Sequence, residues 1–114
     1  MGLGAGGVNV ELLRDATFRI APVDREQARH MIDELRSAAL LRGFRGAPPA
    51  DTQALVEAIV ALSTFALAAG DSLQSVDLNP VVVRAAGCGA VALDAVVVGR
   101  EAQGGTREPL ECKA

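Results

Sequence analysis

Apolar and polar residues alternate in several segments of this chain. Segments 8–13 (Val-Asn-Val-Glu-Leu-Leu) and 16–21 (Ala-Thr-Phe-Arg-Ile-Ala) show the pattern of two strands near the amino terminus. Segments 74–84 and 90–98 are rich in Val and predict two more strands. Residues 85–89 between them contain two glycines, so we expect a hairpin turn that joins the second pair of strands.

Between the two strand pairs, apolar residues recur at helical spacing. A first helix is expected over residues 25–36, with Asp24 as its N-cap. A longer helix is expected from its cap at Asp51 to Gly70, which ends it. The apolar stripes of these two helices are Ala28, Met31, Ile32 and Leu35, and Leu55, Ala58, Ile59, Leu62, Ala66 and Ala69. Residues 37–49 hold two glycines and two prolines and predict a connecting loop.

The order strand, strand, helix, helix, strand, strand predicts an α+β fold, with two helices packed on one face of a largely antiparallel sheet. The chain has 114 residues, a length that allows one domain but not two. We therefore expect a flexible segment at residues 1–5, a folded domain over residues 6–98, and a disordered polar tail over residues 99–114.

Composition and charge exclude several classes of function. The net charge is −3 and aromatic residues make up 3% of the chain, so the basic stripe and stacking platforms of a nucleic-acid-binding protein are missing. The longest apolar stretch, residues 54–69, contains Glu57 and falls short of a membrane span. Cys88 and Cys112 lack metal-ligand spacing, which predicts two reduced thiols. With no signal-peptide pattern at its start, the protein is expected in the cytoplasm, with no nucleic-acid or membrane partner.

Polar residues at alternating positions of the third strand are the clearest candidates for chemistry. Asp77 and Asn79 share one face because side chains alternate along a strand. A hairpin centred on residues 86–87 places Asn79 opposite Asp94 and Asp77 opposite Val96, and Cβ atoms of directly opposed residues lie about 4.5–5.5 Å apart. Two carboxylates and an amide, with no Cys or His, suit Mg²⁺ rather than zinc. The spacing also fits ordinary solvated charges beside an Asn-Pro turn.

The same register places an apolar set on the opposite face of the strand pair, consisting of Leu78, Val82, Val91 and Leu93. Pro80 donates no hydrogen bond, so its strand is expected at a sheet edge or beside a bulge. A slip of one residue in this register would separate the polar cluster, so the candidate site depends on the turn.

Four stretches of sequence carry a family resemblance. They are residues 6–15 (Gly-Gly-Val-Asn-Val-Glu-Leu-Leu-Arg-Asp), 18–22 (Phe-Arg-Ile-Ala-Pro), 40–46 (Leu-Leu-Arg-Gly-Phe-Arg-Gly), and 77–80 (Asp-Leu-Asn-Pro) followed by 92–95 (Ala-Leu-Asp-Ala). In order and spacing they resemble the ATP-grasp region of NDP-forming acyl-CoA synthetases (ADP-forming acetate–CoA ligases), and more distantly the beta subunit of succinyl-CoA synthetase.

This resemblance implies that the chain is the C-terminal lobe of an ATP-grasp domain. In the family, the Asn of the Asn-Pro motif and the Asp on the next strand coordinate the magnesium ion of the nucleotide, which assigns Asn79 and Asp94 as metal ligands. The acidic residue two positions before the Asn lies near the phosphoryl-transfer region, which makes Asp77 the catalytic candidate. With Mg²⁺ and ATP or ADP, the family interconverts acyl-CoA, ADP and phosphate with the acid, CoA and ATP through a phosphorylated histidine.

Large parts of the family's enzymes have no match in this chain. The first ATP-grasp lobe, the CoA-binding domain and the phosphohistidine domain are therefore the expected partners, with ATP and acyl-CoA bound by the full enzyme. His30 lies in the predicted first helix and does not match the phosphorylated histidine. We expect the chain to be inactive by itself. The alternatives are a stand-alone binding or assembly module that forms a homo-oligomer, and the ATP-grasp part of a protein acetyltransferase fusion.

Further residues are weaker candidates. Arg42 and Arg45 sit beside glycines that permit close approach, so they are either cofactor-binding contacts to a phosphate or solvated loop residues. Glu11 is either an accessory carboxylate near the metal or an outward-facing strand residue. The glycine-rich start, residues 2–7, lacks the Lys-Ser/Thr of a phosphate loop and precedes a strand. Nothing in the sequence activates Cys88 as a nucleophile.

Overall fold

The computed structural model describes residues 1–4, 16–43 and 46–101, together with the backbone of residues 111–112. In chain order the elements are β1 (Gly2–Gly4), β2 (Ala16–Phe18), α2 (Arg25–Glu34), α3 (Ala38–Leu41), α4 (Thr52–Ala69), the 3-10 turn η1 (Gly70–Ser72), β3 (Leu73–Leu78), β4 (Val81–Val83), β5 (Ala90–Ala92), β6 (Ala95–Gly99) and β7 (Glu111–Cys112). All described strand pairs are antiparallel, which confirms the predicted α+β class. The strand predicted over residues 8–13 lies outside the described residues.

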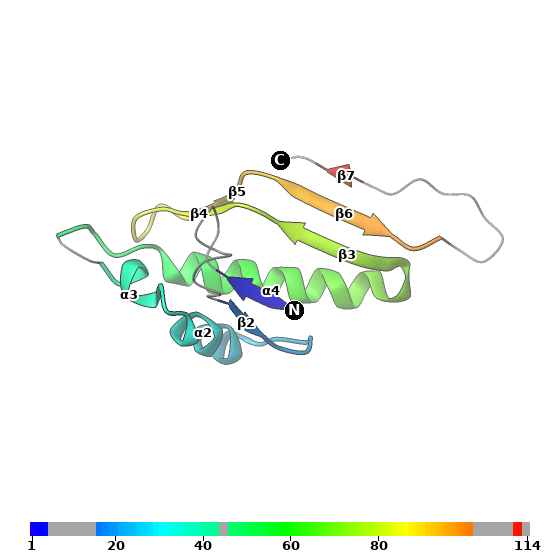
Figure 1. Cartoon of the computed structure of the whole chain (residues 1–114), viewed down its shortest axis with the longest axis horizontal. Coiled ribbons are helices and arrows are strands. Elements are labelled where there is room, and N and C mark those ends of the chain that lie inside the picture. Colours follow the sequence, from blue (N-terminus) through cyan, green and yellow to red (C-terminus); the bar gives the residue numbers. More distant parts are fainter. Residues whose placement is uncertain (5–15, 44–45, 102–110, 113–114) are drawn as a thin grey trace.

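The long helix α4 separates two layers of the molecule (Figure 1). The strands β3 to β6 lie on one side of it, and α2 with the β1–β2 pair lies on the other. α4 contacts α2, β3, β4 and β5, whereas α2 contacts α4, α3 and β2. We predicted both helices on one face of the sheet. Both helices lie on that side of β3 to β6, with α4 packed on the strands and α2 packed behind α4 (Figure 1). This layering is possible because α4 is apolar over most of its circumference and can pack on two sides.

A small apolar core lies between α2 and α4. Its buried members are Val23, Ala28, Met31, Ile32, Leu55, Val56 and Ile59, and the partly buried residues packed against it are Met1, Leu3, Leu41, Val60 and Val83. Most of the buried set belongs to the two helical stripes predicted from sequence. Full burial of each large aliphatic side chain contributes about 1.5–3 kcal/mol, so this cluster holds the helical layer together.

One polar contact anchors α2 inside this core. The hydroxyl oxygen of Ser63 on α4 accepts the backbone N–H of Val23, with the two atoms 2.8 Å apart. Ser63 is 1% exposed and Val23 is 4% exposed, so water cannot replace this acceptor. Because Val23 directly precedes the N-cap of α2, the hydrogen bond fixes the start of that helix against the middle of α4.

The helix α2 begins where the sequence predicted, because Asp24 and Gln27 form a reciprocal capping box. The Asp24 carboxylate accepts the Gln27 backbone N–H at 2.8 Å, and the Gln27 side chain accepts the Asp24 backbone N–H at 3.1 Å. The helix ends at Glu34, before the predicted residue 36, because Leu35 takes an extended backbone conformation.

The segment 37–49, predicted as a loop throughout, contains the short helix α3. Its sequence Ala-Ala-Leu-Leu consists of strong helix formers, and Ala38 is buried at 4% exposure. The backbone N–H of Ala50 donates to the Leu41 carbonyl at 2.7 Å. This hydrogen bond holds Ala50, just before α4, next to the end of α3, so the two ends of the segment that carries Arg42 lie close together.

The third and fourth predicted strands are each divided in two. Asn79 and Pro80 separate β3 from β4, and Leu93 and Asp94 separate β5 from β6. Pro80 has no N–H to donate to a ladder, so the division falls where the sequence predicted an irregularity.

Both ends of the chain contain pairing that composition did not predict. β1 pairs with β2, and the Met1 ammonium group donates to the Arg19 carbonyl at 2.8 Å, within the segment expected to be flexible. β7 pairs with the start of β6, within the segment expected to be a disordered tail. Main-chain pairing needs no apolar side chains, so a glycine-rich or polar composition does not reveal it.

The helical region Thr52–Ser72 is long and apolar enough, by length and composition, to cross a membrane. The expectation that the apolar stretch 54–69 falls short of a membrane span is therefore wrong by length and composition, because the helical region extends beyond this stretch at both ends. Its contacts are those of a core helix: Ser63 binds the Val23 backbone, and Glu57 binds Arg25. We therefore interpret it as the central helix of this fold.

Replacement of Ser63 by Ala is expected to lower the free energy of unfolding by about 1–3 kcal/mol, the cost of a buried N–H without an acceptor. Denaturant titration followed by circular dichroism measures this change. Thr64→Ala is the matched control, because the Thr64 hydroxyl donates to the Val60 carbonyl at 3.0 Å on the exposed side of α4. The control is expected to change stability by less than about 0.5 kcal/mol. Equal losses in the two variants would contradict an anchoring role for Ser63.

Candidate functional site

The divided strands keep a single antiparallel register across the break between them. β4 pairs with β5 so that Val81 lies opposite Ala92. β3 pairs with β6 so that Asp77 lies opposite Val96, as predicted. The only irregularity in this β3–β6 ladder is a shift near Leu73, at the far end from the break.

Asn79 and Asp94 occupy opposed positions inside the break. The Asn79 backbone N–H donates to the Asp94 carbonyl at 3.1 Å, and the Leu93 N–H donates to the Pro80 carbonyl at 2.9 Å. The predicted opposition of Asn79 and Asp94 is therefore confirmed at the level of the backbone. Directly opposed residues of an antiparallel pair have Cβ atoms about 4.5–5.5 Å apart, which is close enough for two side chains to share one ion.

The three candidate side chains are accessible to solvent. Asp77 and Asn79 are exposed while Leu78 between them is half-buried, so the alternation predicted for this strand is observed. Asp94 is half-buried, and its Oδ1 accepts the N–H of Ala95 at 2.9 Å. This hydrogen bond orients the carboxylate, and among the described residues its Oδ2 has no hydrogen-bond partner.

This donor set fits a magnesium ion. Proteins hold Mg²⁺ through one or two carboxylates, and phosphate oxygens or water fill the remaining positions. Within the described ranges, no three His, Cys, Asp or Glu side chains lie close enough together to hold a metal ion. An ion at Asn79 and Asp94 would therefore take most of its ligands from a nucleotide and from water.

The apolar face predicted behind the site is not buried. Its members are exposed or half-buried, with 43% of Val82, 37% of Val91 and 51% of Leu93 exposed, and Leu78 half-buried. The burial alternation changes phase at Asn79–Pro80, so that Val81 and Val83 are the half-buried residues of β4. Val83 packs against the core cluster, which leaves Val82 on the outer surface.

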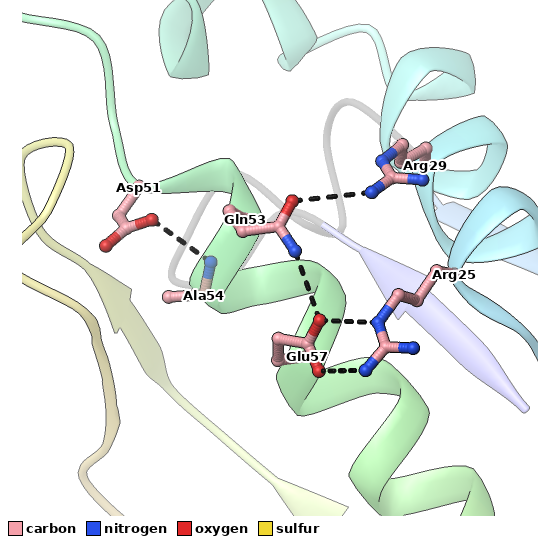
Figure 2. A network of polar contacts seen from close by, with 6 residues as sticks. All are labelled: Arg25, Arg29, Asp51, Gln53, Ala54 and Glu57. Carbon is pink, nitrogen blue, oxygen red and sulfur yellow. Dashed lines mark hydrogen bonds and ion pairs between the residues drawn. The ribbon is translucent and has the colours of Figure 1, made fainter.

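Asp51, predicted as the N-cap of α4, makes a second contact that the sequence did not predict. Its Oδ1 accepts the Ala54 N–H at 3.1 Å and caps the helix (Figure 2). Its Oδ2 accepts the N–H of Gly89, in the hairpin turn, at 2.8 Å. The hydrogen bonds from Ala54 and Gly89 lower the pKa of the Asp51 carboxyl. The capping signal is local, whereas the Gly89 contact joins residues far apart in sequence and has no local signal.

A polar network joins α2 to α4 beside this cap (Figure 2). The Arg25 guanidinium binds both carboxylate oxygens of Glu57, at 2.7 and 3.2 Å, and its hydrogen bond lowers the pKa of Glu57. The Gln53 amide donates to Glu57 at 3.1 Å and accepts from Arg29 at 3.5 Å. The exposed pairs contribute little individually, but together they orient the first turns of α4 against α2.

Arg42 borders a pocket of about 180 Å³ that lies in the helical layer. The pocket is lined by Arg29, Ile32, Asp33, Ala38, Leu41, Arg42, Thr52, Gln53 and Val56. Arg42 Nη2 lies 2.6 Å from Asp33 Oδ1, and both side chains are more than half exposed. This places Arg42 with α2 and the start of α4 rather than with β3. Arg45 and Glu11 lie outside the described residues.

Two residues with reactive side chains stand apart from this arrangement. Cys88 is a free, exposed cysteine in the hairpin turn. His30 is exposed on α2, as expected for an ordinary helix residue.

Comparison with known proteins gives independent findings. A family model described as an ATP-grasp domain matches residues 1–98. The chain is 42% identical over 95 residues to the beta subunit of acetate–CoA ligase [ADP-forming] II from Pyrococcus furiosus. This alignment covers 83% of the chain and 40% of that subunit.

Solved structures agree with this match. A crystal structure of a Pyrococcus horikoshii protein superposes with a TM-score of 0.82 at 36% identity, covering 87% of this chain and 41% of that one. A dinucleotide-forming acetyl-coenzyme A synthetase of Candidatus Korarchaeum cryptofilum, solved with coenzyme A and Mg-AMPPCP, gives a TM-score of 0.78 at 36% identity, covering 87% and 45%. The chain thus spans less than half the length of these similar proteins.

The lowered pKa of Asp51 predicts a pH dependence of stability. The folded state binds fewer protons at this carboxyl than the unfolded state, so its contribution is present above the unfolded pKa of about 3.9 and is lost as the pH falls through the lower folded value. Below about pH 4, the free energy of unfolding should fall less steeply in Asp51→Asn than in the wild type. Denaturant titrations at a series of pH values measure both slopes. Parallel profiles would contradict the prediction.

Proposed function

Because this chain belongs to the ATP-grasp domain family and its relatives include ADP-forming acetate–CoA ligases, we propose that it is the C-terminal ATP-grasp lobe of an acyl-CoA synthetase of this type. The complete enzyme interconverts acyl-CoA, ADP and phosphate with the acid, CoA and ATP. It acts in the cytoplasm. The observation that carries the proposal is the opposition of Asn79 and Asp94 at a solvent-accessible break between two strand ladders.

Asn79 and Asp94 hold the magnesium ion of the nucleotide in this proposal. The Asn79 amide oxygen and the Asp94 carboxylate supply hard oxygen ligands, and the N–H of Ala95 orients the carboxylate. When bound, Mg²⁺ neutralises the charge of the nucleotide's phosphate oxygens during phosphoryl transfer. A protein of similar structure has been solved with Mg-AMPPCP, which supports a magnesium nucleotide as the ligand.

Asp77 and the arginines have supporting roles in the same proposal. Asp77 is exposed on β3, which ends one residue before Asn79, and in this proposal its carboxylate borders the phosphoryl-transfer region. Arg42 and Arg45 contact nucleotide phosphate from the segment that follows α3. Arg42 pairs with Asp33 at the protein surface, and in this proposal a phosphate competes with Asp33 for its guanidinium.

The lobe requires the rest of its enzyme for turnover. The chain spans 40% of the Pyrococcus furiosus subunit that it matches, and the remainder supplies the first ATP-grasp lobe in our proposal. The CoA-binding and phosphohistidine domains complete the enzyme. Val82 on β4, Val91 on β5 and Leu93 just after β5 are exposed beside the proposed ligands, and they fit a surface that another part of the enzyme covers.

In the complete enzyme, Asn79→Ala or Asp94→Ala is expected to lower nucleotide-dependent turnover at least about a hundredfold. A hundredfold loss of activity is about the upper end for replacing a residue that only orients a metal ligand, so replacing a direct ligand should lower activity at least as much. Steady-state assays of acyl-CoA formation measure the loss, and circular dichroism checks the fold.

Asp71→Asn is the matched control, because Asp71 is an exposed acidic residue of η1 at the opposite end of β3. It should leave turnover within about twofold of the wild type, as for a surface substitution away from the site. Near-normal activity in both the Asn79 and Asp94 variants would refute the assigned roles.

The exposed apolar face also favours a second candidate function, a stand-alone assembly module that has lost nucleotide chemistry. In this case a second copy of the chain covers Val82, Val91 and Leu93. The face then serves association alone, and no first lobe is needed.

Sedimentation velocity tests the assembly module. The module predicts a concentration-dependent dimer that Leu93→Lys dissociates, because a charge would be buried in the apolar contact. Glu101→Lys is a control with the same new side chain at an exposed position beyond β6. A wild-type chain that sediments as a monomer at all accessible concentrations would exclude the module.

A further inference from the structure

Residues 49–51, which directly precede α4, are tied to the hairpin turn by their main chain. The Asp51 N–H donates to the Arg84 carbonyl at 2.7 Å, and the Ala86 N–H donates to the Pro49 carbonyl at 3.0 Å. Ala50 and Ala85 form an isolated antiparallel bridge between these bonds. Residues 49–51 thus lie directly against residues 84–86, which follow β4.

The Asp51 side chain also binds the other side of the hairpin turn, next to β5. Its Oδ2 accepts the N–H of Gly89, which directly precedes β5, while its Oδ1 caps α4 through Ala54. Asp51 therefore makes three contacts. Its main-chain N–H binds Arg84 just after β4, its Oδ2 binds Gly89 just before β5, and its Oδ1 binds Ala54 in the first turn of α4.

The β4–β5 hairpin needs such support. Each of its strands has three residues, and an isolated two-stranded hairpin is marginal in water. Asn79 and Asp94 lie in neither ladder, but at the junction between this hairpin and the β3–β6 pair. The β3–β6 ladder fixes the backbone on one side of Asn79 and Asp94. On their other side the backbone is fixed by the β4–β5 hairpin, provided that this hairpin is docked on the rest of the fold. A shift of one residue there would turn the opposed side chains to different faces.

We propose that Asp51 is a positioning residue for the magnesium site: its carboxylate docks the β4–β5 hairpin on the first turn of α4 and thereby holds Asn79 opposite Asp94. This inference rests on the metal-binding roles assigned under the proposed function. Asp51 acts through the hairpin backbone and touches neither the ion nor the nucleotide.

Replacement by Asn separates this role from helix capping. Asn is as good an N-cap as Asp, so the cap of α4 is retained. In the wild type the Ala54 and Gly89 N–H groups bind different carboxylate oxygens of Asp51. Asp51→Asn keeps one of these acceptors for the Ala54 N–H and turns the other into an NH2 donor, which cannot accept the Gly89 N–H. Asp24→Asn is the matched control, because Asp24 caps α2 through Gln27 and contacts no part of the hairpin.

The test compares the wild-type 114-residue chain with these two variants by nuclear magnetic resonance. In Asp51→Asn, amide hydrogen exchange at Gly89 should accelerate about ten- to a hundredfold, the range for losing a hydrogen bond to a charged acceptor. Exchange at Asn79 should accelerate as well, while Val23, whose buried N–H binds the Ser63 hydroxyl, stays protected and shows that the fold is intact. Asp24→Asn should leave Gly89 and Asn79 unchanged.

Paramagnetic Mn²⁺ added together with ADP, whose phosphates supply the remaining ligands, probes the ligand pair in the same samples. The Mn²⁺ concentration that broadens the Asn79 and Asp94 signals to half intensity should rise about tenfold in Asp51→Asn, the lower range for losing a residue that orients a ligand. It should not change in Asp24→Asn.

The possible failures are distinguishable. Unchanged exchange at Gly89 and Asn79 in Asp51→Asn, or Mn²⁺ broadening that the variant leaves unaltered, overturns the positioning role and leaves the metal site in place. No broadening at Asn79 and Asp94 in the wild type overturns the metal site itself, and the positioning role with it.

Discussion

The register of the β4–β5 hairpin is the constraint on which the candidate site depends. Gly87 and Gly89 adopt positive φ angles of 83° and 85°, which only glycine adopts without strain, and the Arg84 N–H closes the turn on the Gly89 carbonyl at 3.0 Å. Each residue of β4 is thereby assigned one partner in β5. The same register continues through the break at Asn79–Pro80 into β3 and β6. The geometry of the turn therefore places Asn79 opposite Asp94.

The helix α4 connects the strands that carry the site to the rest of the lobe. One side contacts β3, β4 and β5, and the other buries Val56 and Ile59 against α2. Its first turn is held by Asp51 and by the network around Glu57, and its middle by the Ser63 contact with the Val23 backbone. The helix therefore joins a polar, accessible strand break to an apolar core, which gives the proposed ion site a rigid support.

The outer surface beside the site carries three exposed apolar residues. Val82 and Val91 lie opposite each other in the β4–β5 ladder, and Leu93 lies next to Asp94. Water exclusion around a metal nucleotide strengthens its electrostatic interactions, so a cover over these residues would serve the chemistry of the site as well as the stability of the enzyme. The chain's match to less than half of its relatives' length is consistent with such a cover.

The sequence by itself determined the two long helices, the hairpin and the site register, because their signals are local. Each of these signals involves residues close together in sequence. They are the apolar stripe that ends at Gly70, the capping residue Asp24, and the glycines of the 85–89 turn. Only the tertiary structure decided how these elements pack. The placement of α2 behind α4, the phase change that exposes Val82 and the contact of Asp51 with Gly89 join distant parts of the chain. Such contacts depend on the shape of the whole fold, because hydrogen-bond partners and packing surfaces far apart in sequence meet only after the chain has folded.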